Sequence, residues 1–461
     1  MLSKTKLKKI LNTCLATGGD FAELFFEDTN AKVTTLENGI IEHANPSITY
    51  GCGIRILKEN QQVYGYTSNV DFESLNSLAH DLSLRFKGKR TTKCKDLVEP
   101  SNDESFNTYE RYGDNVKNKE RVKLLKDCYK VMKKVSKSII SIRNNLIENI
   151  QSVIVCNSNG LYRTDLRVRT RLALACYAQK GDSIEMGFNG PGASMGFEFF
   201  DTFDYLEVAK QVAVAAVTSL KAKPCPSKRM PVIIENGFGG VIFHEACGHS
   251  LEASAVSRNM SVFANKLGEV IASKCVSAVD DGTIVHGWGS QKMDDEGNDM
   301  TRNQLIKDGE LTHYMVDMFN GRRMKTAPTG CSRRESYKYA PTSRMTNTFI
   351  TEGGATLEEM LKDIKYGLYA KSLGGGSVNP ITGDFNFAVN EAYLIKNGKI
   401  AYPVKGATLI GTGAEILKQI DMVGSNLKRA QGMCGASSGS VPVDVGQPRI
   451  RVKEITVGGK K

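Results

Sequence analysis

Apolar residues recur three and four positions apart in several stretches of the N-terminal half, which is the spacing of an amphipathic helix. This pattern predicts helices over residues 2–16, 72–85, 117–137 and 203–222. In the stretch 117–137, lysines occupy the positions between the apolar ones. One face of that helix is therefore expected to be buried and the other solvated.

The segments between these helices alternate apolar and polar residues or are rich in β-branched residues, as strands are. The predicted strands, in chain order, are residues 21–28, 50–56, 62–67, 139–143, 150–156 and 165–177. Asn38-Gly39 and Asn159-Gly160 each predict a tight hairpin turn. The order of a helix followed by hairpin strands thus occurs twice, which suggests a duplicated unit.

We predict an α+β fold, with duplicated helix and β-meander units followed by a strand-rich C-terminal region. The first unit covers residues 1–90 and the second residues 108–222, with a polar and basic surface connection between them. The two prolines within residues 223–227 mark the boundary of the third region, residues 228–461.

Glycine turns divide the rest of the chain. Asp308-Gly309 and Asn397-Gly398 predict hairpins between alternating strands of the C-terminal region. Residues 187–196 are rich in glycine but lack the order of a phosphate-binding loop, so we predict an ordinary loop there.

Composition is typical of a globular intracellular protein. The 461 residues are 41% hydrophobic and 24% charged, and the chain is too long for one compact core. The eleven cysteines are scattered with no C-x-x-C pair, which predicts reduced thiols and a cytoplasmic location. No apolar run approaches the roughly 18 residues of a membrane span, so no membrane association is expected.

The net charge of +11 invites a nucleic-acid interpretation. The basic clusters, however, lack interleaved aromatic residues and any zinc-finger or recognition-helix pattern. We therefore expect no nucleic-acid partner.

Two of the six histidines stand in the run Val241-Ile-Phe-His-Glu-Ala-Cys-Gly-His-Ser-Leu-Glu252. In the H-E-x-x-H motif of zinc peptidases the histidines are four residues apart on one helix face. Here His244 and His249 are five apart, which separates them by about 140° on a regular helix. We therefore predict a local distortion, either a π-bulge or a helix that loosens at Gly248.

Such a site would bind a divalent metal, and zinc is the favoured ion. Glu245 would then act as the general base and afterwards as the general acid. The alternative is that His244 and His249 are ordinary helix histidines, one packed and one solvated. The residues alone leave the third ligand open, with Cys247 and Glu252 as nearby candidates among many others.

The nine residues His-Glu-Ala-Cys-Gly-His-Ser-Leu-Glu resemble the H-E-x-x-x-H-x-L-E signature of the TldD branch of the TldD/PmbA family, also called modulators of DNA gyrase. Further blocks similar to that family follow in order through residues 229–452. They are Val279-Asp-Asp-Gly-Thr283, Asp294-Asp-Glu-Gly297, Pro328-Thr-Gly330, Arg333-Arg-Glu-Ser-Tyr337, Arg344-Met-Thr-Asn-Thr348, Gly374-Gly-Gly376, Glu391-Ala-Tyr-Leu-Ile395, Tyr402-Pro-Val-Lys-Gly-Ala-Thr-Leu-Ile-Gly411, Met422-Val-Gly424, Cys434-Gly435 and Val441-Pro-Val-Asp-Val-Gly-Gln-Pro448.

The resemblance implies that Cys434 is the third ligand of one zinc ion, or another divalent metal, per chain. It also implies a dimer, formed with a PmbA/TldE-type paralogue or with itself. Substrates would be unfolded or leader-type polypeptides, bound as an extended β-strand near Gly374, Gly375 and Gly376. Asp444 departs from the family pattern, which usually has glycine there, and this puts the local loop shape in question.

Two rival functions come from other classes. One is a non-enzymatic regulator that binds a partner such as a topoisomerase, and the other is a metal hydrolase for a non-peptide amide. Intact Glu245 argues against the first rival, because a pure binding protein does not need a general base. Substrate profiling separates the second rival from a peptidase.

Overall fold

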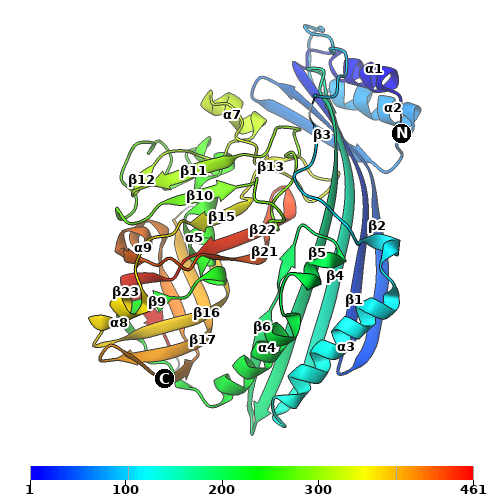
Figure 1. Cartoon of the computed structure of the whole chain (residues 1–461). Helices are drawn as coiled ribbons and strands as arrows, with labels where there is room; N and C mark the ends of the chain where they lie inside the picture. Colours follow the sequence, from blue (N-terminus) through cyan, green and yellow to red (C-terminus); the bar gives the residue numbers. More distant parts are fainter. Residues whose placement is uncertain (1, 102, 380–381, 460–461) are drawn as a thin grey trace.

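A long antiparallel sheet forms one side of the molecule in the computed structural model, which describes residues 2–101, 103–379 and 382–459 (Figure 1). Its strands follow the order β3-β2-β1-β4-β5-β6, and the short β7 pairs with β5. The bounds are β1 Phe21–Glu37, β2 Ile40–Lys58, β3 Gln61–Thr67, β4 Ile139–Asn157, β5 Tyr162–Lys180, β6 Ser183–Asn189 and β7 Gly192–Ala193.

The two predicted N-terminal units join through their first strands. β1 pairs with β4 along its length, with Leu24 opposite Cys156, so the two meanders share one sheet. The predicted turn at Asn38-Gly39 connects β1 to β2, and both residues have positive φ angles of 49° and 89°. The predicted α+β class is confirmed.

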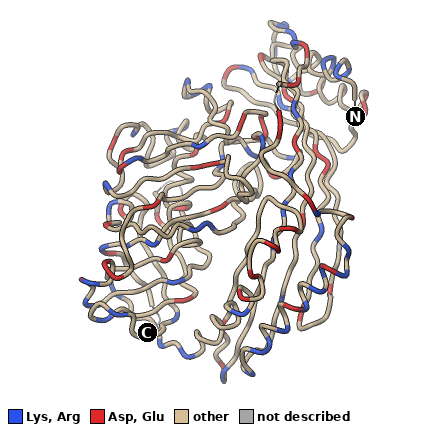
Figure 2. Tube along the Cα trace, viewed as in Figure 1, with Lys and Arg blue, Asp and Glu red and all other residues tan. Residues whose placement is uncertain are grey.

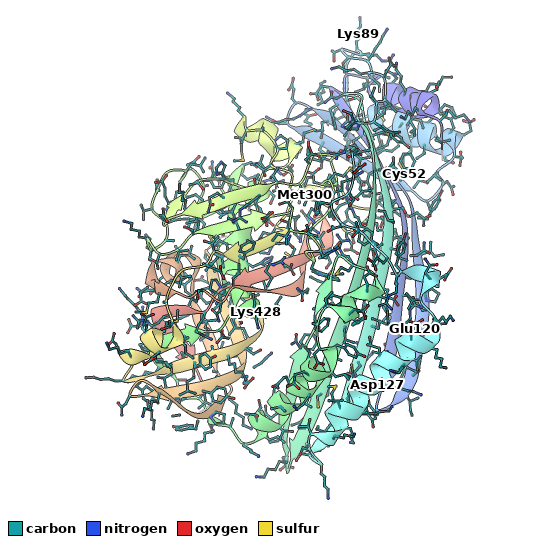
Figure 3. All side chains as sticks on the ribbon, in the orientation of Figure 1. Cys52, Lys89, Glu120, Asp127, Met300 and Lys428 are labelled. Atoms are coloured by element: carbon teal, nitrogen blue, oxygen red, sulfur yellow. The ribbon has the colours of Figure 1, made fainter. Side chains whose placement is uncertain are left out.

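Helices in two pairs cover one face of this sheet, as their apolar stripes predict. Figure 3 shows Glu120 on the outer side of α3, while Cys52 lies within the sheet. Leu7 and Leu11 pack on the sheet from α1, and Val212 and Ala216 do so from α4. The bounds are α1 Lys4–Cys14, α2 Phe72–Ser83, α3 Asn118–Lys134 and α4 Tyr205–Leu220.

The prediction of a plain loop over residues 187–196 is wrong in part. Residues up to Asn189 belong to β6, and Gly192 and Ala193 form β7. Gly187 lies so near α4 that a Cβ atom there would be 2.0 Å from the Val212 carbonyl oxygen. The glycine therefore serves the packing of α4 on an edge strand, which composition alone did not reveal.

A closed sheet and an open one build the C-terminal region. The closed sheet follows β16-β9-β23-β19-β17, and β16 also pairs with β17, which completes a barrel; β18, β8 and β20 extend it. The bounds are β8 Lys223–Pro224, β9 Lys228–Ile234, β16 Tyr366–Val378, β17 Asp384–Lys396, β18 Lys399–Lys405, β19 Thr408–Thr412, β20 Ile420–Val423 and β23 Ile450–Gly458.

The open sheet follows β12-β11-β10-β15-β22-β21, and it places β21 at its edge. The turns predicted at Asp308-Gly309 and Asn397-Gly398 are confirmed, since they connect β11 to β12 and β17 to β18. The bounds are β10 Ala278–Asp281, β11 Arg302–Lys307, β12 Glu310–Leu311, β15 Asn347–Ile350, β21 Lys428–Ala436 and β22 Gly439–Gln447, with a separate pair β13 Ser332–Arg333 and β14 Thr342–Ser343.

Short helices complete this region: α5 Val241–Ala246, α6 Ala253–Val256, α7 Met318–Met324, α8 Leu357–Lys362 and α9 Gly413–Gln419. None of the helices in the described ranges has the length and apolar character needed to span a membrane. In Figure 2, Lys and Arg are distributed along the whole trace together with Asp and Glu.

Buried ion pairs fasten the N-terminal sheet to the C-terminal region. Arg55 lies 2.7 Å from both Glu23 of the sheet and Glu296 of the C-terminal region, and Arg334 lies 2.6 Å from Glu23. All of these side chains are inaccessible to solvent. Because removing one partner of a buried pair leaves an uncompensated charge, loss of any one of these side chains would destabilise the junction.

Candidate metal centre

The β21–β22 hairpin, at the edge of the open sheet, can approach α5 closely because residue 240 is a glycine. β9 leads through a 3-10 turn, Gly237–Gly240, directly into α5. A Cβ atom at Gly240 would lie 2.4 Å from the carbonyl carbon of Gly446 in β22. Only glycine allows this contact, and it brings the β21–β22 hairpin beside the helix that carries His244.

The predicted distortion between the two histidines is confirmed. α5 ends at Ala246, Cys247 has non-helical angles of φ −127° and ψ −48°, and a 3-10 helix continues from Gly248. The helix therefore breaks at Cys247, one residue before the predicted position, and contains no π-bulge at this point. As a result, the rings of His244 and His249 lie 5.1 Å apart between centroids.

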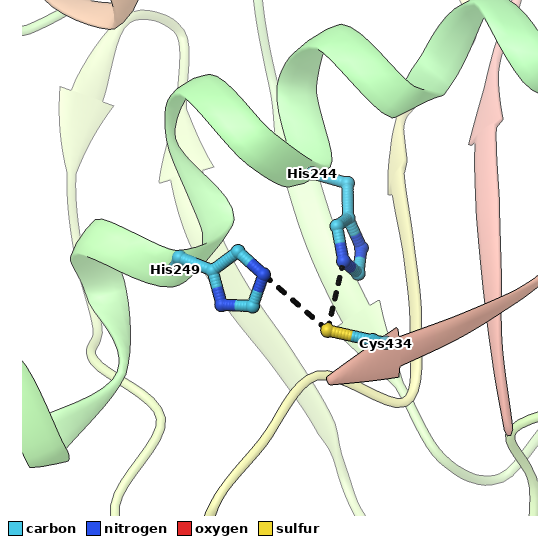
Figure 4. A group of neighbouring side chains, drawn as sticks. All are labelled: His244, His249 and Cys434. Atoms are coloured by element: carbon cyan, nitrogen blue, oxygen red, sulfur yellow. Dashed lines mark hydrogen bonds between the residues drawn. The ribbon is translucent and has the colours of Figure 1, made fainter. Parts of the chain in front are cut away.

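Three donor atoms from distant parts of the chain converge here (Figure 4). Cys434 Sγ lies 3.3 Å from His244 Nε2 and 3.3 Å from His249 Nε2. The three donors all lie within 4.8 Å of one another. One tetrahedral zinc ion holding nitrogen and sulfur ligands needs these atoms roughly 3.5 Å apart, and both distances from Cys434 Sγ match that separation.

The other candidate ligands have different positions. Cys247 is buried in the apolar core of the C-terminal region, and burial raises the pKa of its thiol. Glu252 lies behind His249, with Oε2 3.2 Å from His249 Nδ1. A carboxylate in this position orients a ligand imidazole rather than competing with it.

Burial and nearby charges shift the pKa values of the two imidazoles in opposite directions. Burial, the neighbouring His249 and Arg344 hold the pKa of His244 well below its usual value, so its ring stays neutral. Burial also disfavours the charged form of His249, but Glu252 and Cys434 outweigh it and raise the pKa of His249. Neutral imidazole and thiolate are the forms that bind metal.

Glu245 lies in the wall of an open cavity of about 860 Å³, together with His249 and Glu252. Its Oε2 is 3.6 Å from His249 Nε2. Burial raises the pKa of Glu245, and the positive charge of His249 only partly offsets this. A carboxylate with a raised pKa beside the donor cluster is suited to accept a proton.

Arg344 was not identified as a site residue from the sequence. Its buried guanidinium donates to the Cys434 carbonyl oxygen, to Gly439 O at 2.8 Å and to Ser438 Oγ at 2.9 Å. It thereby fixes the turn of the β21–β22 hairpin and the backbone of Cys434. The family-like block Arg344-Met-Thr-Asn-Thr348 includes this arginine, but the sequence does not show which backbone atoms it contacts.

Asp444 stands in regular strand pairing opposite Gln431. Its buried carboxylate accepts hydrogen bonds from Gln431 Nε2 at 2.9 Å and from the Trp288 amide at 3.2 Å. Burial raises the pKa of Asp444 to about 6. The departure from the family pattern therefore leaves the hairpin intact.

The glycine run Gly374–Gly376 lies within β16 rather than in a turn. Gly374 is buried, whereas Gly375 and Gly376 are exposed. The following residues, Ser377 and Val378, line the same cavity as Glu245.

We expect Glu252→Gln to weaken metal binding about 10–100-fold, because an amide is a poorer acceptor for the His249 Nδ1 proton. The measurement is competition for the metal against a calibrated chelator. Glu358→Gln, which changes an exposed glutamate of α8, is the control and should retain the affinity of the unaltered chain. Equal affinity of all three proteins would show that Glu252 does not support the ligand.

The fold and this site define a metallopeptidase, and comparison with known proteins agrees. Domain models of the PmbA/TldA metallopeptidases match residues 22–83 (domain 1), 111–220 (central domain) and 227–459 (C-terminal domain). The chain belongs to the PmbA/TldD family.

Individual relatives cover nearly the whole chain. The metalloprotease TldD homologue of Haemophilus influenzae is 35% identical, over 99% of this chain and 97% of its own. A metalloprotease of Methanocaldococcus jannaschii is 31% identical, over 98% and 99% of the two chains. The solved structure of TldE from Thermococcus kodakarensis is similar in fold, with a TM-score of 0.74, 18% identity and coverage of 99% and 100%.

Proposed function

We propose that His244, His249 and Cys434 hold one zinc ion per chain and that Glu245 is the general base and acid of peptide hydrolysis. The observation that carries the proposal is the convergence of two imidazole nitrogens and a cysteine sulfur beside an open cavity. One thiolate and two imidazoles suit zinc, whereas magnesium and calcium take oxygen ligands.

When bound, such an ion acidifies water and polarises a peptide carbonyl group. Glu245 removes a proton from the attacking water and donates it to the leaving nitrogen. Glu252 keeps Nε2 of His249 directed at Cys434 Sγ by holding the opposite ring nitrogen. Arg344 keeps the backbone of Cys434 in place.

The proposed substrates are unfolded or leader-type polypeptides, bound as an added β-strand. Supporting this, β16 ends in residues that line the cavity, and its exposed glycines leave the backbone accessible. Main-chain hydrogen bonds would give such recognition its tolerance of sequence.

Gly375→Val is expected to raise KM for unstructured peptides about fivefold to tenfold, because a branched side chain blocks the approach of a strand. A Cβ atom at Gly375 has no neighbour within 4 Å, so the fold should tolerate the change. Gly354→Val is the matched control, since Gly354 is also exposed with open space around it. Both variants are measured by steady-state kinetics. If they gave the same KM, β16 would not be the strand that binds the substrate.

The direct test of the function combines metal analysis with peptide cleavage. Purified protein should contain about one zinc per chain by elemental mass spectrometry and should cleave an unstructured peptide library, read by mass spectrometry. A chelator should abolish cleavage and added zinc should restore it. Zinc-loaded protein that cleaves only non-peptide amides would favour the rival hydrolase.

We also propose a dimer, with a TldE-type paralogue or with a second copy, in the reducing cytoplasm. The fold shared with TldE and the eleven free thiols support these assignments. Light scattering of the chain alone and of the chain co-expressed with its paralogue distinguishes the two dimers.

A further inference from the structure

The wall of the cavity that holds Glu245 includes an arginine. The charged residues that line this cavity are Glu245, Glu252 and Arg258, together with the imidazole of His249. Both carboxylates lie near His249, with Glu245 Oε2 3.6 Å from its Nε2 and Glu252 Oε2 3.2 Å from its Nδ1. Within the described part of the chain, Arg258 is therefore the one lining residue with a permanent positive charge.

The guanidinium of Arg258 has no partner among residues 2–101, 103–379 and 382–459. Its side chain is exposed, and no ion pair, hydrogen bond or aromatic ring engages it there. The arginines of the neighbouring α7 differ in this respect, because Arg322 pairs with Asp20 at 2.6 Å and Arg323 donates to the Asn60 carbonyl oxygen at 3.3 Å. The donors of Arg258 are therefore available to a ligand in the cavity.

Hydrogen bonds fix the turn that carries Arg258. The turn follows α6, and the Arg258 amide donates to the Ala255 carbonyl oxygen at 3.2 Å. Ser257 Oγ donates to Asn320 Oδ1 of α7 at 2.9 Å, and Asn320 also lines the cavity. α6 itself begins directly after Glu252, which lies behind the ligand histidine. The backbone of Arg258 is therefore held at the cavity wall from both sides.

Apolar side chains make up much of the remaining wall, among them Met260, Phe319, Pro341 and Val378. A ligand against such a surface loses part of its water, and a charge pair is stronger there than in bulk solvent. A guanidinium presents a planar fork of N–H donors, which matches the two oxygens of a carboxylate. The wall therefore favours a ligand that carries a carboxylate beside apolar groups.

We infer that Arg258 is a specificity-determining residue and binds a carboxylate of the polypeptide substrate. This inference rests on the proposed function, because it takes a polypeptide as the occupant of the cavity. The carboxylate belongs either to an aspartate or glutamate side chain or to the C-terminus of the peptide. The first source would direct cleavage to acidic segments, and the second would direct it to the free end of a chain.

The test measures peptide binding to zinc-loaded Glu245→Gln protein, which does not cleave. Each peptide has about 12 residues and a neutral N-terminal dye, and fluorescence anisotropy gives Kd. The reference peptide has glutamine at each scanned position and a C-terminal amide, so it contains no carboxylate. Glutamate at one scanned position should lower Kd about fivefold if the source is a side chain, and a free C-terminal acid should do so if the source is the C-terminus.

Substitutions of Arg258 in the same background show whether this residue binds the carboxylate. Arg258→Gln should bind the acidic peptide and the reference peptide equally, and Arg258→Glu should bind the acidic peptide more weakly than the reference. Arg258→Lys keeps the charge but loses the planar fork, so it should retain part of the preference. Arg85→Gln is the matched control, because Arg85 is also exposed and lies outside the cavity wall; it should retain the full preference.

The results distinguish the role of Arg258 from the proposed substrate class. If the reference peptide binds and no carboxylate lowers its Kd, the assignment of Arg258 is wrong while the proposed substrate class stands. A preference that persists in Arg258→Gln, with unchanged Tm and zinc content, would also overturn the assignment, because another group would then bind the carboxylate. If no peptide binds, the proposed substrate class fails and the inference fails with it.

Discussion

Glu245→Gln should lower kcat for peptide hydrolysis about 10³-fold while the protein keeps its metal. General acid and base catalysis contributes about 10²–10⁴-fold, and the amide of glutamine cannot take up a proton at neutral pH. Glu245 is not one of the three converging donors, so the substitution should leave zinc content and Tm unchanged. Single-turnover kinetics on an unstructured peptide, with elemental analysis of the same sample, gives both quantities.

The control for this experiment is Glu358→Gln, which makes the same chemical change on an exposed helix outside the cavity. It should retain full turnover. Comparable turnover by Glu245→Gln and the unaltered chain would remove Glu245 from the mechanism, whereas joint loss of zinc and turnover would give it a role in metal binding instead.

Cys434→Ser should reduce zinc content from about one ion per chain to less than about a tenth and abolish turnover. A serine hydroxyl is a far weaker zinc ligand than a thiolate, and two imidazoles alone leave the ion underligated. Serine matches cysteine in shape, so the β21–β22 hairpin should persist and unfolding should reflect only the loss of bound metal.

Cobalt substitution provides an independent readout for this variant. Cobalt-loaded protein should show a thiolate-to-metal charge-transfer absorption that Cys434→Ser lacks. Cys275→Ser is the matched control, because Cys275 is the exposed cysteine and lies outside the donor cluster. Full zinc content in Cys434→Ser would exclude the thiolate as a ligand.

The predictions made from sequence succeeded where the signal is local. Helical spacing located α1 to α4, and Asn38-Gly39 located the first hairpin, because each of these depends on residues close together in the chain. The joining of two meanders through β1 and β4 gave no local signal, since it depends on pairing between residues more than a hundred positions apart.

The residues of the site likewise fall into those with a local signal in the sequence and those without one. The five-residue spacing of His244 and His249 was enough to predict a break in the helix, because the angle around a helix follows from spacing. Cys434 came from the family resemblance alone, since the residues themselves pointed first to the nearby candidates Cys247 and Glu252. Arg344 was missed because its importance lies in contacts with backbone atoms of the β21–β22 hairpin.

The location of Cys434 on a hairpin near the C-terminus has a consequence for biosynthesis. β21 pairs with β22, and β22 pairs with β15, so Cys434 belongs to a hairpin that lies 185 positions after His249 in the chain. During synthesis, both histidines and Glu245 are therefore present before Cys434 is added. The proposed donor cluster is therefore completed only when the β21–β22 hairpin has folded against the earlier part of the chain.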